Sequence, residues 1–184
     1  MAVVDGAHYD ELTADLARAV SDLCAMLDAD PALWARARPG KWTGGQHAEH
    51  VAISLELFAS MFDDSSRQLA AGTLPAVPGR GPLQSLFQLL VVRPGWMARG
   101  GVTVPAARPG ASPNREVVLR RLHSAPDRYR GLGAGLDAAA RDRLWIRNPF
   151  MTLLRWHYAL PEAARIQAVH VRHHAAQIAE LKHS

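Results

Sequence analysis

Apolar side chains recur at the spacing of an amphipathic helix in four stretches of the chain. The first covers residues 9–28, with an apolar stripe at positions 12, 16, 19, 20, 23 and 27 and with Asp and Arg on the other face. The others run from about 44 to 71, over 114–139, and from Pro161 to about 182. No strand-like alternation of useful length occurs. The pattern predicts an all-α protein built as an antiparallel four-helix bundle.

Cap and turn residues mark the expected ends of these helices. Asp30-Pro31 ends the first helix, and Gly72 ends the second. Thr43 stands three residues before Gln46, a capping-box arrangement that predicts the start of the second helix. Pro126 lies within the third stretch, where it can kink or split the helix.

Residues 73–113 differ in composition from the predicted helices and are rich in proline and glycine. A connection of this length in a compact domain is usually a functional cover, a partner surface or partly disordered. We interpret it as an excursion between the second and third helices of a single domain, residues 1–184. The apolar segment 82–92 predicts a short helix within it, and a further short helix is expected at 151–158.

Composition narrows the function classes. The net charge is +4, but the basic residues are scattered arginines, with Lys41 and Lys182 as the lysines, which argues against a nucleic-acid surface. No apolar run reaches the roughly 18 residues of a membrane span, and the N-terminus lacks the pattern of a signal peptide. The lone Cys24 excludes an intramolecular disulfide and a cysteine metal knuckle. A cytoplasmic location is the resulting expectation.

The last predicted helix carries three histidines within five residues, His170, His173 and His174. At 100° per residue, His170 and His174 lie about 40° apart on one face, and His173 lies about 60° to the other side of His170. A pair spaced i, i+4 offers two nitrogens to one metal ion, although 170/173 is also a permissible pair. His50, on the inward face of the second helix, is the candidate third ligand.

Three imidazoles from facing helices suit Zn²⁺, Ni²⁺, Fe²⁺ or Cu²⁺. Such a site leaves one or more coordination positions for water or substrate, as catalytic sites do. The alternative is that these histidines are partly buried polar residues satisfied by hydrogen bonds.

Two histidine segments resemble the DinB/YfiT-like superfamily. One is Trp42-Thr-Gly-Gly-Gln-His-Ala-Glu-His50, and the other is His170-x-x-His173-His174-x-x-Gln177. Asn148-Pro149-Phe150 and Val104-Pro105-Ala106 are also similar to segments of that family, so the likeness covers nearly the whole chain.

The resemblance implies a four-helix bundle that holds one divalent metal, commonly nickel or zinc, through His50, His170 and His174. His173 would then lie next to the metal without binding it. Characterised relatives are thiol-dependent S-transferases and a mycothiol-dependent maleylpyruvate isomerase, so a low-molecular-weight thiol is a candidate cosubstrate beside a small-molecule substrate. Many relatives have no assigned reaction. Related bundles often form homodimers, and we expect one here.

The neighbours of these residues have two interpretations each. His47, one turn from His50, either lines the pocket or lies at its rim. Gln177 either supports a ligand by a hydrogen bond or packs as an ordinary polar residue. Cys24 is interpreted as a small packing residue rather than a nucleophile. The leading hypothesis is a metal-dependent enzyme of the thiol-dependent transferase or isomerase type; the alternatives are a metal-dependent hydrolase and a stress-associated metal-binding protein without turnover.

Overall fold

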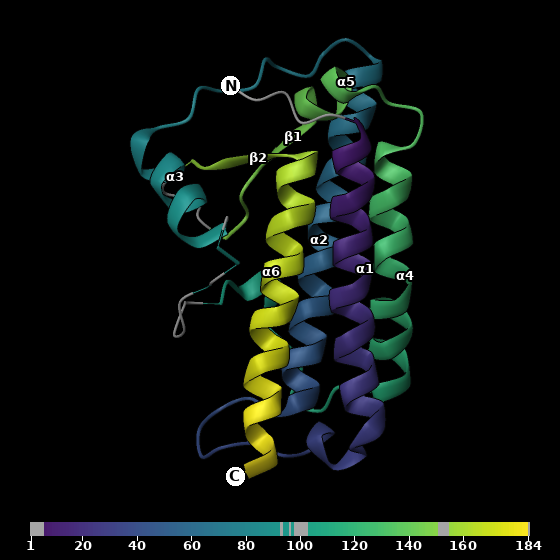
Figure 1. Ribbon diagram of the computed structural model, residues 1–184, viewed down its shortest axis with the longest axis vertical. Helices are drawn as coiled ribbons and strands as arrows, with labels where there is room; N and C mark the ends of the chain where they lie inside the picture. Colours follow the sequence, from purple (N-terminus) through teal and green to yellow (C-terminus); the bar gives the residue numbers. More distant parts are fainter. Residues whose placement is uncertain (1–5, 93, 96, 98–102, 151–154, 184) are drawn as a thin grey trace.

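Four long helices dominate the computed structural model, which describes residues 6–92, 94–95, 97, 103–150 and 155–183 (Figure 1). They lie side by side, and the prediction of a mainly helical protein is confirmed. Helix α1 contacts α4 and α6, and α2 contacts the same two helices. The bounds of the four are α1 Gly6–Ala29, α2 Gly44–Ala70, α4 Arg115–Gly133 and α6 Leu160–Ala179.

The direction of the helices explains the long excursion. Helices α1 and α6 run one way and α2 and α4 run the other way, as the colours in Figure 1 show. Two consecutive parallel helices need a connection that returns along the bundle. Helix α2 has 27 residues, and at 1.5 Å per residue it is about 40 Å long. Residues 73–113 span this return.

Local signals read from the sequence define both histidine-bearing helices. The Thr43 hydroxyl accepts a hydrogen bond from the Gln46 amide, and the Gln46 side chain accepts one from the Thr43 amide, so the capping box is confirmed. Gly72, just beyond α2, has φ +69°, a conformation that favours glycine. Pro161 occupies the first turn of α6, where its missing N–H has no cost.

One short sheet accompanies the helices, and the hydrophobic pattern gave no sign of it. Strands β1 (Trp145–Arg147) and β2 (His157–Ala159) pair as an antiparallel two-stranded sheet. Three-residue strands are too short to produce a readable alternation. The short helix expected at 151–158 is contradicted at residues 157–158, which lie in β2, whereas 151–154 fall outside the described residues.

The third predicted helix, 114–139, ends earlier than expected. Helix α4 stops at Gly133, and a separate short helix, α5 (Ala138–Arg143), follows after Gly135, which has φ +73°. Pro126 lies inside α4 without ending it. After this early stop the chain continues through α5 into β1, which contacts α2.

The excursion contains the short helix expected at 82–92. It begins as α3 (Pro82–Phe87) and continues as a π-helical turn, η2 (Gln88–Val92). The Gln84 side chain donates a hydrogen bond to the carbonyl of His157, which fixes α3 against the β2 strand. Farther along, the turn η3 (Pro105–Ala107) contacts α2. The excursion therefore lies against the helices that carry the histidines.

The core is formed by apolar side chains of all four long helices and of the hairpin. Its largest fully buried members are Tyr9, Tyr129, Tyr158, Phe58, Phe62, Leu16, Leu23, Leu27, Leu33, Leu55, Leu122 and Leu144. Among the described residues, none of the helices combines the length and the apolar character needed to cross a bilayer.

Candidate metal centre

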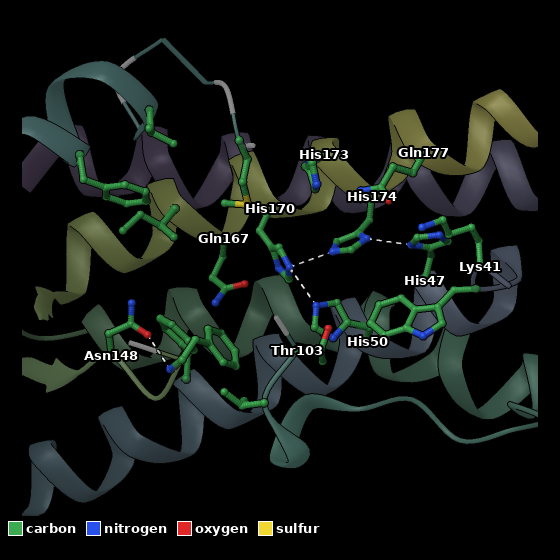
Figure 2. A pocket seen from close by; sticks show the side chains of 18 of the residues that line it. Lys41, His47, His50, Thr103, Asn148, Gln167, His170, His173, His174 and Gln177 are labelled. Atoms are coloured by element: carbon green, nitrogen blue, oxygen red, sulfur yellow. Dashed lines mark hydrogen bonds between the residues drawn. The ribbon is translucent and has the colours of Figure 1, made fainter. Parts of the chain in front are cut away.

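The candidate centre lies where α2 and α6 face each other. Because the capping box fixes the start of α2, His47 and His50 fall in its first two turns and project toward α6. His170 and His174 project back from α6, one turn apart (Figure 2). The two helices run in opposite directions, and their histidine side chains meet between them (Figure 2).

Three of these histidines bring their nitrogens together. His170 Nε2 lies 3.2 Å from His50 Nε2 and 3.0 Å from His174 Nε2. All three residues can offer one ligand nitrogen each within 4.8 Å of the others. His50 and His174 are buried, and His170 is half-buried. These are the three histidines that the sequence analysis put together.

Two further contacts orient the rings of His50 and His174, which lie on either side of His170. His50 Nδ1 lies 2.7 Å from the carbonyl oxygen of Ala107, in η3. A carbonyl only accepts, so His50 Nδ1 carries the proton and its Nε2 keeps a lone pair. His174 Nδ1 lies 2.9 Å from His47 Nδ1, so one of these two nitrogens donates to the other. A hydrogen bond to the second ring nitrogen is the usual way a metal-binding histidine is held.

The three histidines carry too few ring protons to form a hydrogen bond at each of their mutual contacts. His50 Nε2 has no proton to give, and His170 Nε2 faces both His50 and His174 with a single nitrogen. If His170 Nε2 carries a proton, it can donate well to only one of its two neighbours, His50 Nε2 or His174 Nε2. If it carries none, neither nitrogen of the His50–His170 contact has a proton. Converging lone pairs in a buried site are unfavourable unless something positive accepts them. A cation would accept them.

Burial also keeps these rings neutral. It lowers the pKa of His170 to about 3 and that of His47 to about 4, and the nearby His50 and His173 lower both further. Burial lowers the pKa of His50 as well, although its bond to the Ala107 carbonyl raises it in part. The pKa of His174 lies well below its usual value for the same reason. Neutral imidazole is the form that binds a metal.

The donor set and spacing fit a divalent ion. Two imidazole nitrogens that share an ion at 2.0–2.1 Å are about 2.8–3.4 Å apart at octahedral or tetrahedral angles. The separations from His170 Nε2, 3.2 and 3.0 Å, fall in that interval. The residues present therefore suit zinc, nickel or another imidazole-binding metal.

The histidines line the wall of a cavity of about 820 Å³. Trp42 forms part of the same wall, with its ring 5.1 Å from the ring of His50 and 5.4 Å from that of His47. The remaining wall comes from the loop before α2, from α2 itself, from the excursion, the hairpin, α6 and the turn after it: Arg38, Gly40, Lys41, Phe58, Phe87, Val91, Met97, Thr103, Val104, Asn148, Phe150, Trp156, Tyr158, Ile166, Gln167, His173, Gln177, Glu180 and Leu181. A small molecule in this cavity can reach the histidine nitrogens.

The other predicted neighbours have distinct places. His47 is buried and lines the cavity, in contact with His174. His173 packs its ring 5.3 Å from that of His174 and lies outside the three-histidine group. Gln177 lines the cavity half-buried, and none of the described hydrogen bonds joins it to a histidine. Cys24 is buried on α1, away from the cavity wall, as its interpretation as a packing residue requires.

Sequence reasoning missed three contributors. The Ala107 carbonyl is a backbone group, and only its neighbours Val104-Pro105-Ala106 gave a signal. Trp42 was singled out only as the first residue of the Trp42–His50 segment, but its ring also contacts the histidine rings. Gln167 is buried in the cavity wall three residues before His170, a spacing that would have identified it as an inward residue.

Comparisons with protein-family models, with curated proteins and with solved structures found no match to this chain. The resemblance to the DinB/YfiT-like superfamily therefore stays a prediction from the two histidine segments.

Proposed function

We propose that this protein is a metal-dependent enzyme of the DinB/YfiT type, in which His50, His170 and His174 hold one divalent ion at the wall of the cavity. The observation that carries the proposal is the convergence of three neutral histidines, with too few protons to satisfy one another, on a space of about 820 Å³. Nickel and zinc are the expected metals. Both accept three imidazoles and retain positions for a small molecule.

The reaction we assign is thiol-dependent transfer or isomerisation of a small electrophile. When bound, the ion would stabilise a thiolate or lower the pKa of a water molecule. The chain itself holds the imidazoles in place through Ala107 and His47, and Trp42 covers one side of the rings.

A thiol from solution is favoured because the protein provides none at the site. Cys24 is 2% exposed and lies in the core rather than in the cavity wall. Cavities that bind small molecules commonly measure about 300–1,000 Å³, so this one has room for an electrophile and at least part of a thiol. In keeping with the composition we place the enzyme in the cytoplasm, and in keeping with the resemblance we propose that it is a homodimer.

Metal content is the first test. Protein purified without a metal-affinity tag should contain about one divalent metal per chain by elemental analysis. Metal-free protein should take up zinc or nickel to the same level. A chain that stays empty on titration would rule the proposal out.

Thiol transfer is the second test, with chlorodinitrobenzene as the model electrophile and glutathione, bacillithiol or mycothiol as the thiol. The sulfur forms a bond to the ring carbon, chloride leaves, and the thiol proton passes to the buffer. We expect turnover that depends on the metal. Metal-loaded protein that turns over none of the three thiols would exclude the transferase and leave a hydrolase or a binding protein.

A further inference from the structure

The cavity has two different ends on either side of the histidines. Residues that follow His50 on α2 and residues that precede His170 on α6 lie at the same end, because the two helices run in opposite directions. Figure 2 shows Gln167 and Asn148 on that side of the histidines and Lys41 and Gln177 on the other.

The end that contains Gln167 is lined by aromatic rings. Phe58 packs against Phe150 with ring centroids 5.5 Å apart, and Phe87 packs against Trp156 at 4.9 Å. Apart from the histidines, the charged residues among the described cavity lining are Arg38, Lys41 and Glu180. Glu180 follows α6, and Arg38 pairs with it at 3.3 Å, so these charges belong to the opposite end. The aromatic end therefore suits a neutral apolar body.

Gln167 is a buried polar residue in this largely apolar end. Its side chain is 1% exposed and extends into the cavity from the face of α6 that carries His170. Its carbonyl oxygen Oε1 accepts no hydrogen bond from any described residue. Asn148, the other amide of this end, donates to the Tyr158 hydroxyl at 3.0 Å and accepts from the Phe150 amide at 2.7 Å.

An amide oxygen buried without a partner lowers stability, because it loses its hydrogen bonds to water and gains none in return. Such a group is retained where something outside the chain supplies the partner. Gln167 and His170 are three residues apart on one helix, which puts their Cβ atoms about 5–6 Å apart. One small molecule can therefore contact both the histidine centre and the Gln167 amide.

We propose that Gln167 determines substrate specificity by accepting a hydrogen bond from the substrate. The substrate class is a neutral aromatic or conjugated compound with a hydroxyl or N–H donor close to its reacting atom. Its apolar body fills the aromatic end, its donor binds Gln167 Oε1, and its reacting atom lies at the histidines. The inference rests on the proposed function, which places the reacting atom at the His50, His170 and His174 centre.

The test compares two probes that differ in one donor. Benzohydroxamic acid carries an aromatic ring, a metal-binding group and an N–H, whereas N-methylbenzohydroxamic acid lacks the N–H. Calorimetry on zinc-loaded protein should show the N-methyl probe binding about 3- to 10-fold more weakly, the value of one hydrogen bond. In Gln167→Met the ratio of the two dissociation constants should fall to about 1. An unchanged ratio in Gln167→Met would overturn the proposal.

Gln177→Met is the matched control, because Gln177 lies on the same helix and lines the same cavity on the other side of His174. It should keep the wild-type ratio; loss of the ratio in this variant too would mean a general change in the cavity and would overturn the assignment to Gln167.

The melting temperature of Gln167→Met gives a second criterion. Because the Gln167 carbonyl oxygen has no partner among the described residues, replacing this side chain by an apolar one of similar size should leave the melting temperature unchanged or raise it. A fall of several degrees would mean that Gln167 has a structural role, for example through a bridging water, and would also overturn the proposal.

Failure of the metal site is read separately. Elemental analysis decides whether wild-type protein and Gln167→Met take up zinc. Benzamide and N,N-dimethylbenzamide, which need no metal, repeat the N–H comparison on metal-free protein. Zinc bound without N–H discrimination rejects the role of Gln167 and leaves the proposed function intact. If the protein takes up no zinc but binds benzamide more tightly than N,N-dimethylbenzamide, the role of Gln167 is supported and the proposed function is rejected.

Discussion

His47 Nδ1 lies 2.9 Å from His174 Nδ1 across the interface between α2 and α6. The contact leaves His174 Nε2 directed at His170 Nε2, 3.0 Å away. The donor in this pair decides whether His174 presents a lone pair to a metal. With His174 Nδ1 donating, His47 is the acceptor that fixes the ring and its tautomer. His47 is therefore a positioning residue for His174.

Replacing His47 by alanine should weaken metal binding without abolishing it. Loss of the hydrogen-bond partner of a metal-binding histidine typically costs 10–100-fold in affinity. We expect a loss of about 10-fold or more in zinc affinity for His47→Ala, measured by competition with a chelating dye. His47→Gln keeps an acceptor and should recover part of the loss. Equal zinc affinities in the wild type and His47→Ala would contradict the positioning role.

Replacing a candidate ligand should weaken zinc binding more than replacing the adjacent His173. His50→Ala and His174→Ala each remove one of the three converging nitrogens. Each variant should therefore lose more zinc affinity than the roughly 100-fold that removal of a ligand's hydrogen-bond partner typically costs. His173→Ala is the control, because His173 lies next to His174 but outside the group. It should retain tight binding of about one zinc per chain by elemental analysis. Tight binding in His50→Ala would show that His50 is not a ligand.

The sequence allowed the helices and the histidine cluster to be predicted because both depend on local signals. The Thr43–Gln46 capping box fixes the phase of α2, and the phase decides that His47 and His50 face inward. Spacing alone left both His170/His173 and His170/His174 as permissible pairs. In the structure His170 Nε2 lies 3.0 Å from His174 Nε2, and His173 lies outside the three-histidine group.

What the sequence did not predict depends on contacts between distant segments. The β1–β2 pair consists of three-residue strands held together by each other and by the ends of the helices, so no periodicity revealed it. The bond from His50 Nδ1 to Ala107 joins residues 57 apart through a backbone carbonyl, a group that every residue carries. The lack of a hydrogen-bond partner for Gln167 Oε1 among the described residues depends on the residues packed around it, which come from distant parts of the sequence.

The metal-free protein should lose stability as the solution becomes acidic. Burial lowers the pKa of His170 to about 3 and that of His47 to about 4. Below the unfolded pKa of about 6.5, the unfolded chain binds protons that the folded chain does not. The free energy of unfolding therefore falls as the pH decreases from about 6.5 toward 4, by up to about 1.4 kcal/mol per pH unit for each such proton.

Urea unfolding with a chelator present, between pH 7.5 and 5, measures this dependence. His170→Gln removes one of the groups and should show a shallower fall in unfolding free energy than the wild type. The same slope in both proteins would mean that His170 binds its proton equally in the folded and unfolded chains.

Cys24 should be dispensable for catalysis. Its thiol is 2% exposed, and burial raises its pKa to about 11, so it carries little thiolate at neutral pH. Cys24→Ala should keep wild-type metal content and thiol-transfer rate, with a stability cost of about 1 kcal/mol. Iodoacetamide should label Cys24 in urea but not in the folded protein. Loss of turnover in a folded, metal-loaded Cys24→Ala would contradict a thiol supplied from solution.

Two glycines of α4 provide a matched test of the packing that supports the bundle. A Cβ on Gly133 would lie 2.2 Å from Cε1 of Tyr9, whereas one on Gly131 meets nothing within 4 Å. Tyr9 is 1% exposed and donates to the Tyr129 carbonyl at 2.5 Å, so its ring has little freedom to move aside. We expect Gly133→Ala to lower the unfolding free energy by about 1–3 kcal/mol through overpacking. Gly131→Ala should be neutral or stabilising by up to about 1 kcal/mol, since alanine favours the helix. Urea unfolding at constant pH measures both, and a stable Gly133→Ala would mean that α1 and α4 separate more easily than the Tyr9–Tyr129 contact implies.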